Sequence, residues 1–232
     1  MGASAKGRGI RAVQQPMASV EESVKKHFAR VFVAKDWSLF KKMAEFYLRR
    51  AAFLRTNDVD VEQNLKLLVR NAHKRLFIGV GSELLLKAIY LKHGFAINKT
   101  PSGAQPTLKF PFTFPQIGNT QLLADKTYML DDLINHLNKV LSLQNLGGVL
   151  KGLKIAKVFR NKEGHTVVSK HAFDHSNYRD IENTLIALYA AAFNEGLKVR
   201  LSVSPGEKAG WDSVRRNAVV APTLRKRRIA HL

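Results

Sequence analysis

The chain has 232 residues, of which 38 are Lys or Arg and 18 are Asp or Glu, so its formal net charge is +20. Hydrophobic residues make up 45% of the sequence, which supplies a sizeable core and excludes a wholly disordered chain. Cysteine is absent, which excludes disulfide frameworks, thiolate metal sites and cysteine nucleophiles. The charge predicts an anionic partner, with nucleic acid ahead of a membrane surface.

The sequence predicts one folded domain between two basic arms. Residues 1–20 contain three basic residues and no acidic residue, and their composition predicts a mobile arm. Residues 201–232 form a basic C-terminal tail that includes four consecutive basic residues at 225–228. We therefore place the folded domain at residues 21–200.

The chain carries no predicted membrane segment. No apolar stretch approaches the roughly 20 residues that a membrane span needs, and the N-terminus lacks the apolar centre of a signal peptide. N-myristoylation is disfavoured because Lys6 stands where that motif has Ser or Thr. We expect a cytoplasmic protein that does not bind membranes.

Apolar spacing predicts helices along most of the domain. The predicted helices cover residues 38–55, about 61–92, about 126–143, 149–160 and 176–194. Gly94 follows the second helix as its expected C′ residue. These elements predict an all-α fold, an up-and-down bundle of four to five helices.

Each predicted helix carries apolar residues that mark its packing face. These are Leu39, Met43, Phe46, Leu48, Ala51 and Leu54 in the first helix, Leu65, Leu68, Ala72 and Leu76 in the second, Leu130, Leu133, Leu137 and Val140 in the third, and Ile181, Leu185, Leu188 and Ala192 in the last. Gly79 and Gly81 would each weaken an exposed helix by roughly 1 kcal/mol relative to Ala. If they are buried, they would instead let a neighbouring helix approach closely.

Residues 95–120 form a long Pro/Phe-rich loop insertion with four prolines. A loop of this length in a compact domain is functional, packed by its aromatic residues, or both. The alternation of Phe110, Phe112 and Phe114 predicts a short extended piece.

The most informative motif lies in the basic window at residues 151–170. It combines Arg160, Asn161 and His165. RNA can be cleaved by attack of the ribose 2′-OH on the adjacent phosphorus, which needs a proton acceptor, a proton donor and a cation facing the phosphorane. Histidine and arginine provide these groups without a metal. The spacing alone also arises by chance, in which case Arg160 is a surface cation and His165 a loop residue.

The motif RNKEGH at residues 160–165 resembles the Arg-x(4–6)-His motif of the HEPN superfamily, whose members are helical bundles and mostly RNases. The segment at 80–94, VGSELLLKAIYLKHG, resembles the helix of that family that pairs an acidic residue with an apolar-Lys-Ala stretch and ends at Gly. The segment at 126–137, KTYMLDDLINHL, is similar to the one that follows it. With the closing helix at 176–194, the resemblance covers residues 38–196 in the family's order.

The resemblance implies a metal-independent RNA endonuclease that cleaves through 2′-OH attack, in phage defence or in toxin-like growth arrest. It implies a homodimer in which two copies of the motif form one composite cleft. On this reading Arg160 stabilises the transition state at the scissile phosphate, His165 is the general acid or base, and Asn161 orients ribose or phosphate. No cofactor and no metal are implied.

Further side chains are expected to support the site. The lysines expected to contact RNA are Lys154, Lys157, Lys162 and Lys170. Glu83 is expected either to hold Arg160 or His165 in place, or to form an i,i+4 ion pair with Lys87.

The sequence differs from the HEPN pattern at two places, and two other functions are also considered. Val167 stands where related toxins often carry a Tyr, so regulation by nucleotide attachment is unsupported, although an antitoxin or a defence-system partner remains possible. The loop at 95–120 is longer than the family's usual connection.

One alternative function is a non-catalytic module that binds nucleic acid or a partner protein, and another is an accessory subunit of a neighbouring enzyme.

Two other clusters have weaker signals. The segment Arg70-Asn71-Ala72-His73 imitates the motif, but the gap is too short and a structural role is expected. His171 and His175 are spaced for one helix face but lack a clear third ligand, so we expect no metal site.

Overall fold

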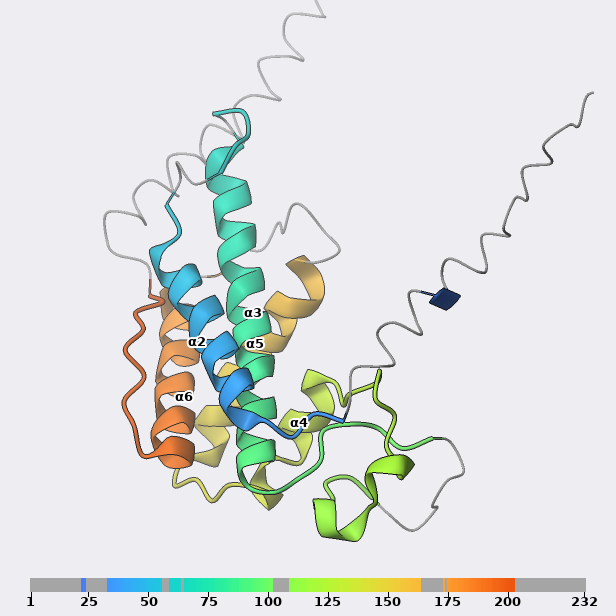
Figure 1. Cartoon of the computed structure of the whole chain (residues 1–232). Coiled ribbons are helices and arrows are strands. Elements are labelled where there is room, and N and C mark those ends of the chain that lie inside the picture. Colours follow the sequence, from blue (N-terminus) through green and yellow to red (C-terminus); the bar gives the residue numbers. More distant parts are fainter. Residues whose placement is uncertain are drawn as a thin grey trace, which may run out of the picture.

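The computed structural model describes residues 22–23, 33–55, 59–63, 65–101, 109–163, 173 and 175–202. Within them the chain is all-α, with five α-helices packed as a bundle (Figure 1). The helices are α2 (Trp37–Phe53), α3 (Lys66–Lys92), α4 (Leu130–Asn135), α5 (Leu146–Glu163) and α6 (His175–Phe193). Three short 3-10 turns accompany them, η2 (Phe114–Gln116), η3 (Asn119–Gln121) and η4 (Leu137–Lys139).

The four long helices run up and down around a shared core. α3 packs along both α2 and α5, and α6 packs along α5 (Figure 1). Side chains also join α6 to α2, since Trp37 stacks on Phe193 at 5.7 Å and the Tyr189 hydroxyl donates to Glu45 at 2.5 Å. The bundle is therefore closed around the apolar faces of all four helices.

Glycines allow the helices to approach closely. A Cβ built on Gly81 would lie 2.8 Å from Cγ of Leu48 on α2, and one on Gly79 would lie 2.6 Å from Cβ of Arg160 on α5. A Cβ on Gly152 of α5 would lie 2.7 Å from the carbonyl oxygen of Asp180 on α6. The prediction that Gly79 and Gly81 admit neighbouring helices is confirmed.

Gly94 ends α3 as predicted. Its φ of +81° is left-handed, a conformation that glycine adopts without steric cost. The Gly94 N–H bonds to the Leu91 carbonyl at 3.0 Å and the Phe95 N–H to the Tyr90 carbonyl at 2.9 Å. This pair of bonds is a Schellman motif, and it turns the chain out of the bundle.

The described part of the Pro/Phe-rich segment is packed by its aromatic residues. Phe110 and Phe112 are buried, and Phe110 stacks on Tyr90 of α3 at 5.4 Å with an interplanar angle of 7°. An isolated antiparallel bridge joins Phe95 to Thr113, but residues 110–111 form a bend and Phe114 begins the turn η2, so the extended piece predicted at Phe110–Phe114 is reduced to this one bridge. Residues 102–108 lie outside the described part of the chain.

The helix predicted over 126–143 is wrong in length. Only α4 and the turn η4 are helical there, although Leu130, Leu133, Leu137 and Val140 are all buried as predicted. The backbone before α4 pairs with residues 97–99 instead, through bonds from Lys99 N to Lys126 O and from Tyr128 N to Ile97 O, both 2.8 Å. The Asp132 carboxylate then accepts from Met129 N at 3.1 Å and sets the start of α4.

The packing faces predicted for two helices are also partly wrong. In α2, Leu48, Ala51 and Leu54 are buried, but Leu39, Met43 and Phe46 are exposed. In the first half of α3 the buried residues are polar ones, Arg70, Asn71, Lys74 and Arg75, whereas Leu65 is 42% exposed and Leu68, Ala72 and Leu76 are half-buried. The face predicted for the last helix is confirmed, since Ile181, Leu185, Leu188 and Ala192 are all buried.

The folded body extends past α6. Leu201 is fully buried, and its N–H and that of Ser202 donate to one Glu182 carboxylate oxygen at 2.6 and 3.0 Å. The predicted arm at 1–20 and most of the predicted tail at 201–232 lie outside the described residues. Among the described helices, none combines the length and the apolar character needed to cross a membrane.

Candidate functional site

The candidate site is centred on Arg160, in the last turn of α5. Its Nε donates to one carboxylate oxygen of Glu83 on α3, and the Lys87 ammonium lies 2.8 Å from the other oxygen. The Glu83 and Lys87 side chains are 10% and 11% exposed, whereas the Arg160 side chain is 31% exposed. The carboxylate therefore anchors Arg160 from inside the bundle, while part of the Arg160 side chain remains exposed.

Both roles considered for Glu83 are present together. A carboxylate has two oxygens, so it can accept from Arg160 and from Lys87 at the same time. The Lys87 ammonium also donates to the Thr127 hydroxyl at 3.0 Å. This network joins α5, α3 and the segment that precedes α4.

Backbone contact fixes the position of Arg160 along α3. The virtual Cβ of Gly79 would lie 2.6 Å from the Arg160 backbone nitrogen and 2.7 Å from its Cα. Gly79 lies one helical turn before Glu83, so the same face of α3 provides both the close contact and the carboxylate. Any larger residue at position 79 would push α5 away from Glu83.

Of the other two motif residues, Asn161 belongs to the described part of the chain and His165 does not. Nη1 of Arg160 lies 3.4 Å from Oδ1 of the exposed Asn161, a long hydrogen bond. His165 and Lys170 lie outside the described residues. The structure thus brings Arg160, Asn161 and Glu83 together and leaves the position of His165 as a prediction.

The lysines of α5 lie at different positions around the helix relative to Arg160. Lys154 and Lys162 are exposed, and Lys157 is half-buried with its ammonium 2.5 Å from the Asp131 carboxylate of α4. The helical repeat places Lys154 and Lys162 toward the outer side of α5, away from Arg160, whereas Lys157 precedes Arg160 by three residues and lies on its side of the helix. The Asp131 carboxylate already neutralises part of the charge of Lys157.

The segment at residues 70–73 has the structural role predicted for it. Arg70 is buried and its Nε donates to the Leu54 carbonyl at 3.0 Å, while Asn71 is 2% exposed. His73 is exposed and its ring stacks on Phe77 at 6.2 Å. None of these contacts places Arg70 and His73 around a common substrate.

The predicted absence of a metal site is tested only in part. His171 lies outside the described residues, and His175 pairs with Arg179, whose Nη2 lies 3.2 Å from the imidazole Nε2. Among the described residues no group of three or more His, Asp or Glu side chains could hold a metal ion.

Two buried cations near the site were missed in the sequence. The Lys74 ammonium lies 5.2 Å above the Tyr178 ring, and the Arg75 guanidinium lies 5.6 Å from the Phe173 ring. Arg75 precedes Gly79 by one helical turn, so it shares the face of α3 that meets α5. The four-residue spacing of Arg75, Gly79 and Glu83 places these residues on one face of a helix, and this spacing was the signal available in the sequence.

Comparison with known proteins found no relative of this chain. No protein-family model matches the chain, and neither a curated protein nor a solved structure matches it significantly. The likeness to the HEPN superfamily therefore remains a prediction that rests on the motif and the order of the helices.

Proposed function

We propose that this protein is a metal-independent RNA endonuclease of HEPN type that acts in phage defence or in toxin-like growth arrest. The observation that carries the proposal is the anchoring of Arg160 by the nearly buried Glu83, beside the exposed Asn161. An anchored guanidinium is oriented before substrate arrives, which is the condition for electrostatic stabilisation of a transition state.

The charge of the anchored group suits a phosphate ligand. Glu83 neutralises one of its two partner cations, so the cluster formed with Arg160 and Lys87 keeps a net positive charge. Nε of Arg160 is used by Glu83, while the terminal amino groups carry further N–H donors. These donors can contact phosphate oxygens at the end of α5.

The proposed reaction transfers the phosphoryl group within the RNA strand. The 2′-oxygen forms a bond to phosphorus as a base removes its proton, and the bond from phosphorus to the 5′-oxygen breaks as an acid protonates that oxygen. Arg160 faces the charge that develops on the phosphorane, and His165 accepts or donates a proton. The products are a 2′,3′-cyclic phosphate and a 5′-hydroxyl.

The proposal includes a homodimer with a composite cleft. One imidazole cannot be both protonated and unprotonated at the same moment, and two facing copies of the motif would supply one acid and one base. The exposed lysines of α5, Lys154 and Lys162, would then line the approach of the RNA strand.

Cleavage in the presence of EDTA tests the proposal. Wild-type protein is incubated with structured and unstructured RNAs, and the 3′ ends are analysed for a cyclic phosphate. We expect cleavage without added metal and its loss in Arg160→Ala and His165→Ala, with RNA binding retained in both variants. Strict dependence on added Mg²⁺ would overturn the mechanism.

The second candidate is a non-catalytic module that binds nucleic acid. The exposed Lys154 and Lys162 on the outer face of α5 favour it, because phosphate binding alone needs no histidine. If the purified protein binds RNA with strong salt dependence and leaves it uncleaved, this second function is the correct one.

A further inference from the structure

The outward face of α2 carries an apolar stripe. Leu39, Phe46 and Phe53 recur every seven residues and are 56%, 58% and 74% exposed, and Met43 between them is 39% exposed. A seven-residue spacing keeps side chains on one side of a helix. The stripe is apolar from Leu39 to Phe46, and the exposed Arg50, seven residues after Met43, interrupts it before Phe53.

The bundle itself does not account for this stripe. α2 fills the core with Ala44, Leu48 and Ala51, which lie on its opposite side and are at most 1% exposed. The stripe continues onto α3 through Tyr47 and Phe77, whose ring centroids are 5.8 Å apart. Contiguous exposed apolar surface of this kind marks an interaction site.

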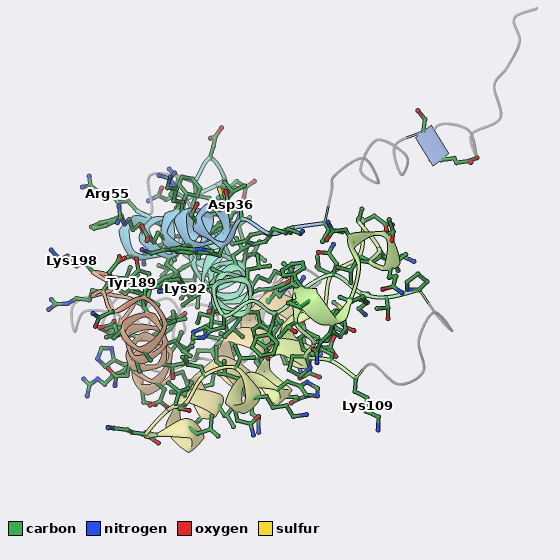
Figure 2. All side chains as sticks on the ribbon, turned by 60° about the horizontal axis from the view of Figure 1, so that its bottom comes forward. Asp36, Arg55, Lys92, Lys109, Tyr189 and Lys198 are labelled. Atoms are coloured by element: carbon green, nitrogen blue, oxygen red, sulfur yellow. The ribbon has the colours of Figure 1, made fainter. Side chains whose placement is uncertain are left out.

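Basic side chains border the stripe on one side. Lys42 and Arg49 are exposed and also seven residues apart, so they flank the apolar residues along the same edge. Beyond this edge lies a hollow of about 480 Å³ between α2 and the segment after α6, lined by Lys42, Arg49 and Lys198 together with Glu45 and Glu195. Glu45 forms an i,i+4 ion pair with Arg49 at 3.4 Å, with the Arg49 side chain 63% exposed. Figure 2 shows Lys198 near Tyr189 on this side of the bundle.

We propose that the outward face of α2 docks an acidic amphipathic helix of a partner protein. Apolar residues of that helix would cover Leu39, Phe46 and Phe53, and its Asp or Glu residues would face Lys42 and Arg49. Helices pair in this way when an apolar seam is bordered by opposite charges.

Charge decides between this partner and a second copy of the chain. Two copies of α2 packed antiparallel through the stripe would bring the Lys42 and Arg49 edges of both copies together. Like charges at such flanking positions oppose pairing of two copies through this stripe. An acidic helix gains from the same charges.

The docking surface is separate from the candidate site. Figures 1 and 2 place α2 on one side of α3 and α5 on the other. Arg160 belongs to the last turn of α5. The inference therefore does not rest on the proposed ribonuclease function, and either can fail alone.

A designed helix tests the docking surface in the full chain. The probe is a peptide of about three heptads with Leu at the seam and Glu at the flanking positions. The matched control peptide has Lys in place of Glu. By titration calorimetry we expect the Glu peptide to bind at least about tenfold more tightly than the Lys peptide.

Two protein variants sharpen the result. The double variant Phe46→Ser, Phe53→Ser should lose binding of the Glu peptide, and its circular dichroism should match that of the wild type because both side chains are exposed. The double variant Lys42→Glu, Arg49→Glu should reverse the preference and bind the Lys peptide more tightly.

Three outcomes would overturn the proposal. Equal binding of the Glu and Lys peptides would show that the partner helix need not be acidic, which contradicts the proposal. A dimer of the wild type that the double variant Phe46→Ser, Phe53→Ser dissociates in sedimentation would show that a second copy covers the stripe. Binding to phosphatidylserine vesicles that the same variant abolishes would assign the stripe to an anionic lipid surface.

Discussion

Gly79 of α3 lies directly against the backbone of Arg160 of α5, because a Cβ at position 79 would be 2.6 Å from the Arg160 nitrogen. This contact sets the distance between the two helices at the point where Glu83 reaches the guanidinium. The absence of a side chain at one residue thus determines the placement of the cation at the centre of the proposed site.

The variant Gly79→Ala should lower the free energy of unfolding by about 1–3 kcal/mol, the usual cost of inserting a methyl group into a packed contact. The nearest atoms are backbone, which cannot rotate away. Urea denaturation measures the change. Gly147→Ala is the matched control, since no atom lies within 4 Å of its virtual Cβ, and it should be neutral or stabilising by up to about 1 kcal/mol. Equal effects of the two variants would contradict the close contact.

The variant Glu83→Gln should destabilise the fold by about 2–4 kcal/mol, because it leaves Lys87 without a carboxylate at a nearly buried position. The effect should stay below the roughly 3–5 kcal/mol of a fully buried pair, since Arg160 is 31% exposed. Asp131→Asn serves as the control in the same denaturation experiment. It breaks an exposed ion pair with Lys157 and should cost only about 0–1 kcal/mol. A Glu83→Gln variant as stable as the wild type would refute the anchoring role.

Stability should decline above pH 10 through Tyr189 and Tyr90. Burial raises the pKa of the Tyr189 hydroxyl, and its bond to the Glu45 carboxylate adds to the effect. Burial raises the pKa of Tyr90, whose hydroxyl donates to the Leu133 carbonyl at 2.8 Å. The fold favours the neutral phenols, so this stability is fully present below the unfolded pKa of about 10 and is lost as pH rises above it.

Denaturation at several alkaline pH values measures this decline. Tyr189→Phe cannot ionise, so its stability should fall less steeply with pH than that of the wild type. If both proteins lose stability in parallel, the raised pKa of Tyr189 is refuted.

RNA binding should depend unequally on the lysines of α5. Each phosphate contact with single-stranded RNA contributes about 0.7 to the slope of log K against log salt. Lys154→Ala should lower this slope by about that amount, whereas Lys157→Ala should lower it less because Asp131 already neutralises Lys157. Filter binding at several salt concentrations measures both. A larger loss of slope in Lys157→Ala than in Lys154→Ala would contradict the ion pair between Lys157 and Asp131.

The sequence predicted the helices best where apolar residues alone form the core. In α6 the predicted face is the buried face, since Ile181, Leu185 and Leu188 are at most 1% exposed. In the first half of α3 the rule fails, since buried cations such as Lys74 and Arg75 pack over aromatic rings of other elements. Such pairs join residues far apart in the sequence, so the spacing along one helix does not show which ring a cation packs on.

Non-local backbone pairing explains the overextended helix at 126–143. Lys126 and Tyr128 satisfy the backbone of residues 97–99, and this pairing has no counterpart in local spacing. At the candidate site the pattern identified Glu83, with either Arg160 or His165 as the residue that it holds, or Lys87 as its ion-pair partner. The structure pairs Glu83 with Arg160 and with Lys87. The pattern treated these two partners as alternatives because spacing does not reveal that one carboxylate serves both.

The most direct test of the proposed function compares two cations of α5 in one reaction. Single-turnover cleavage of RNA is measured in EDTA for the wild type, Arg160→Ala and Lys154→Ala. We predict a loss of roughly 10²–10³-fold for Arg160→Ala, typical of removing one donor to a transition-state oxyanion. Lys154→Ala should stay within a few-fold of the wild type at saturating protein. Equal and small losses in the two variants would show that Arg160 contributes only charge, and would contradict the account.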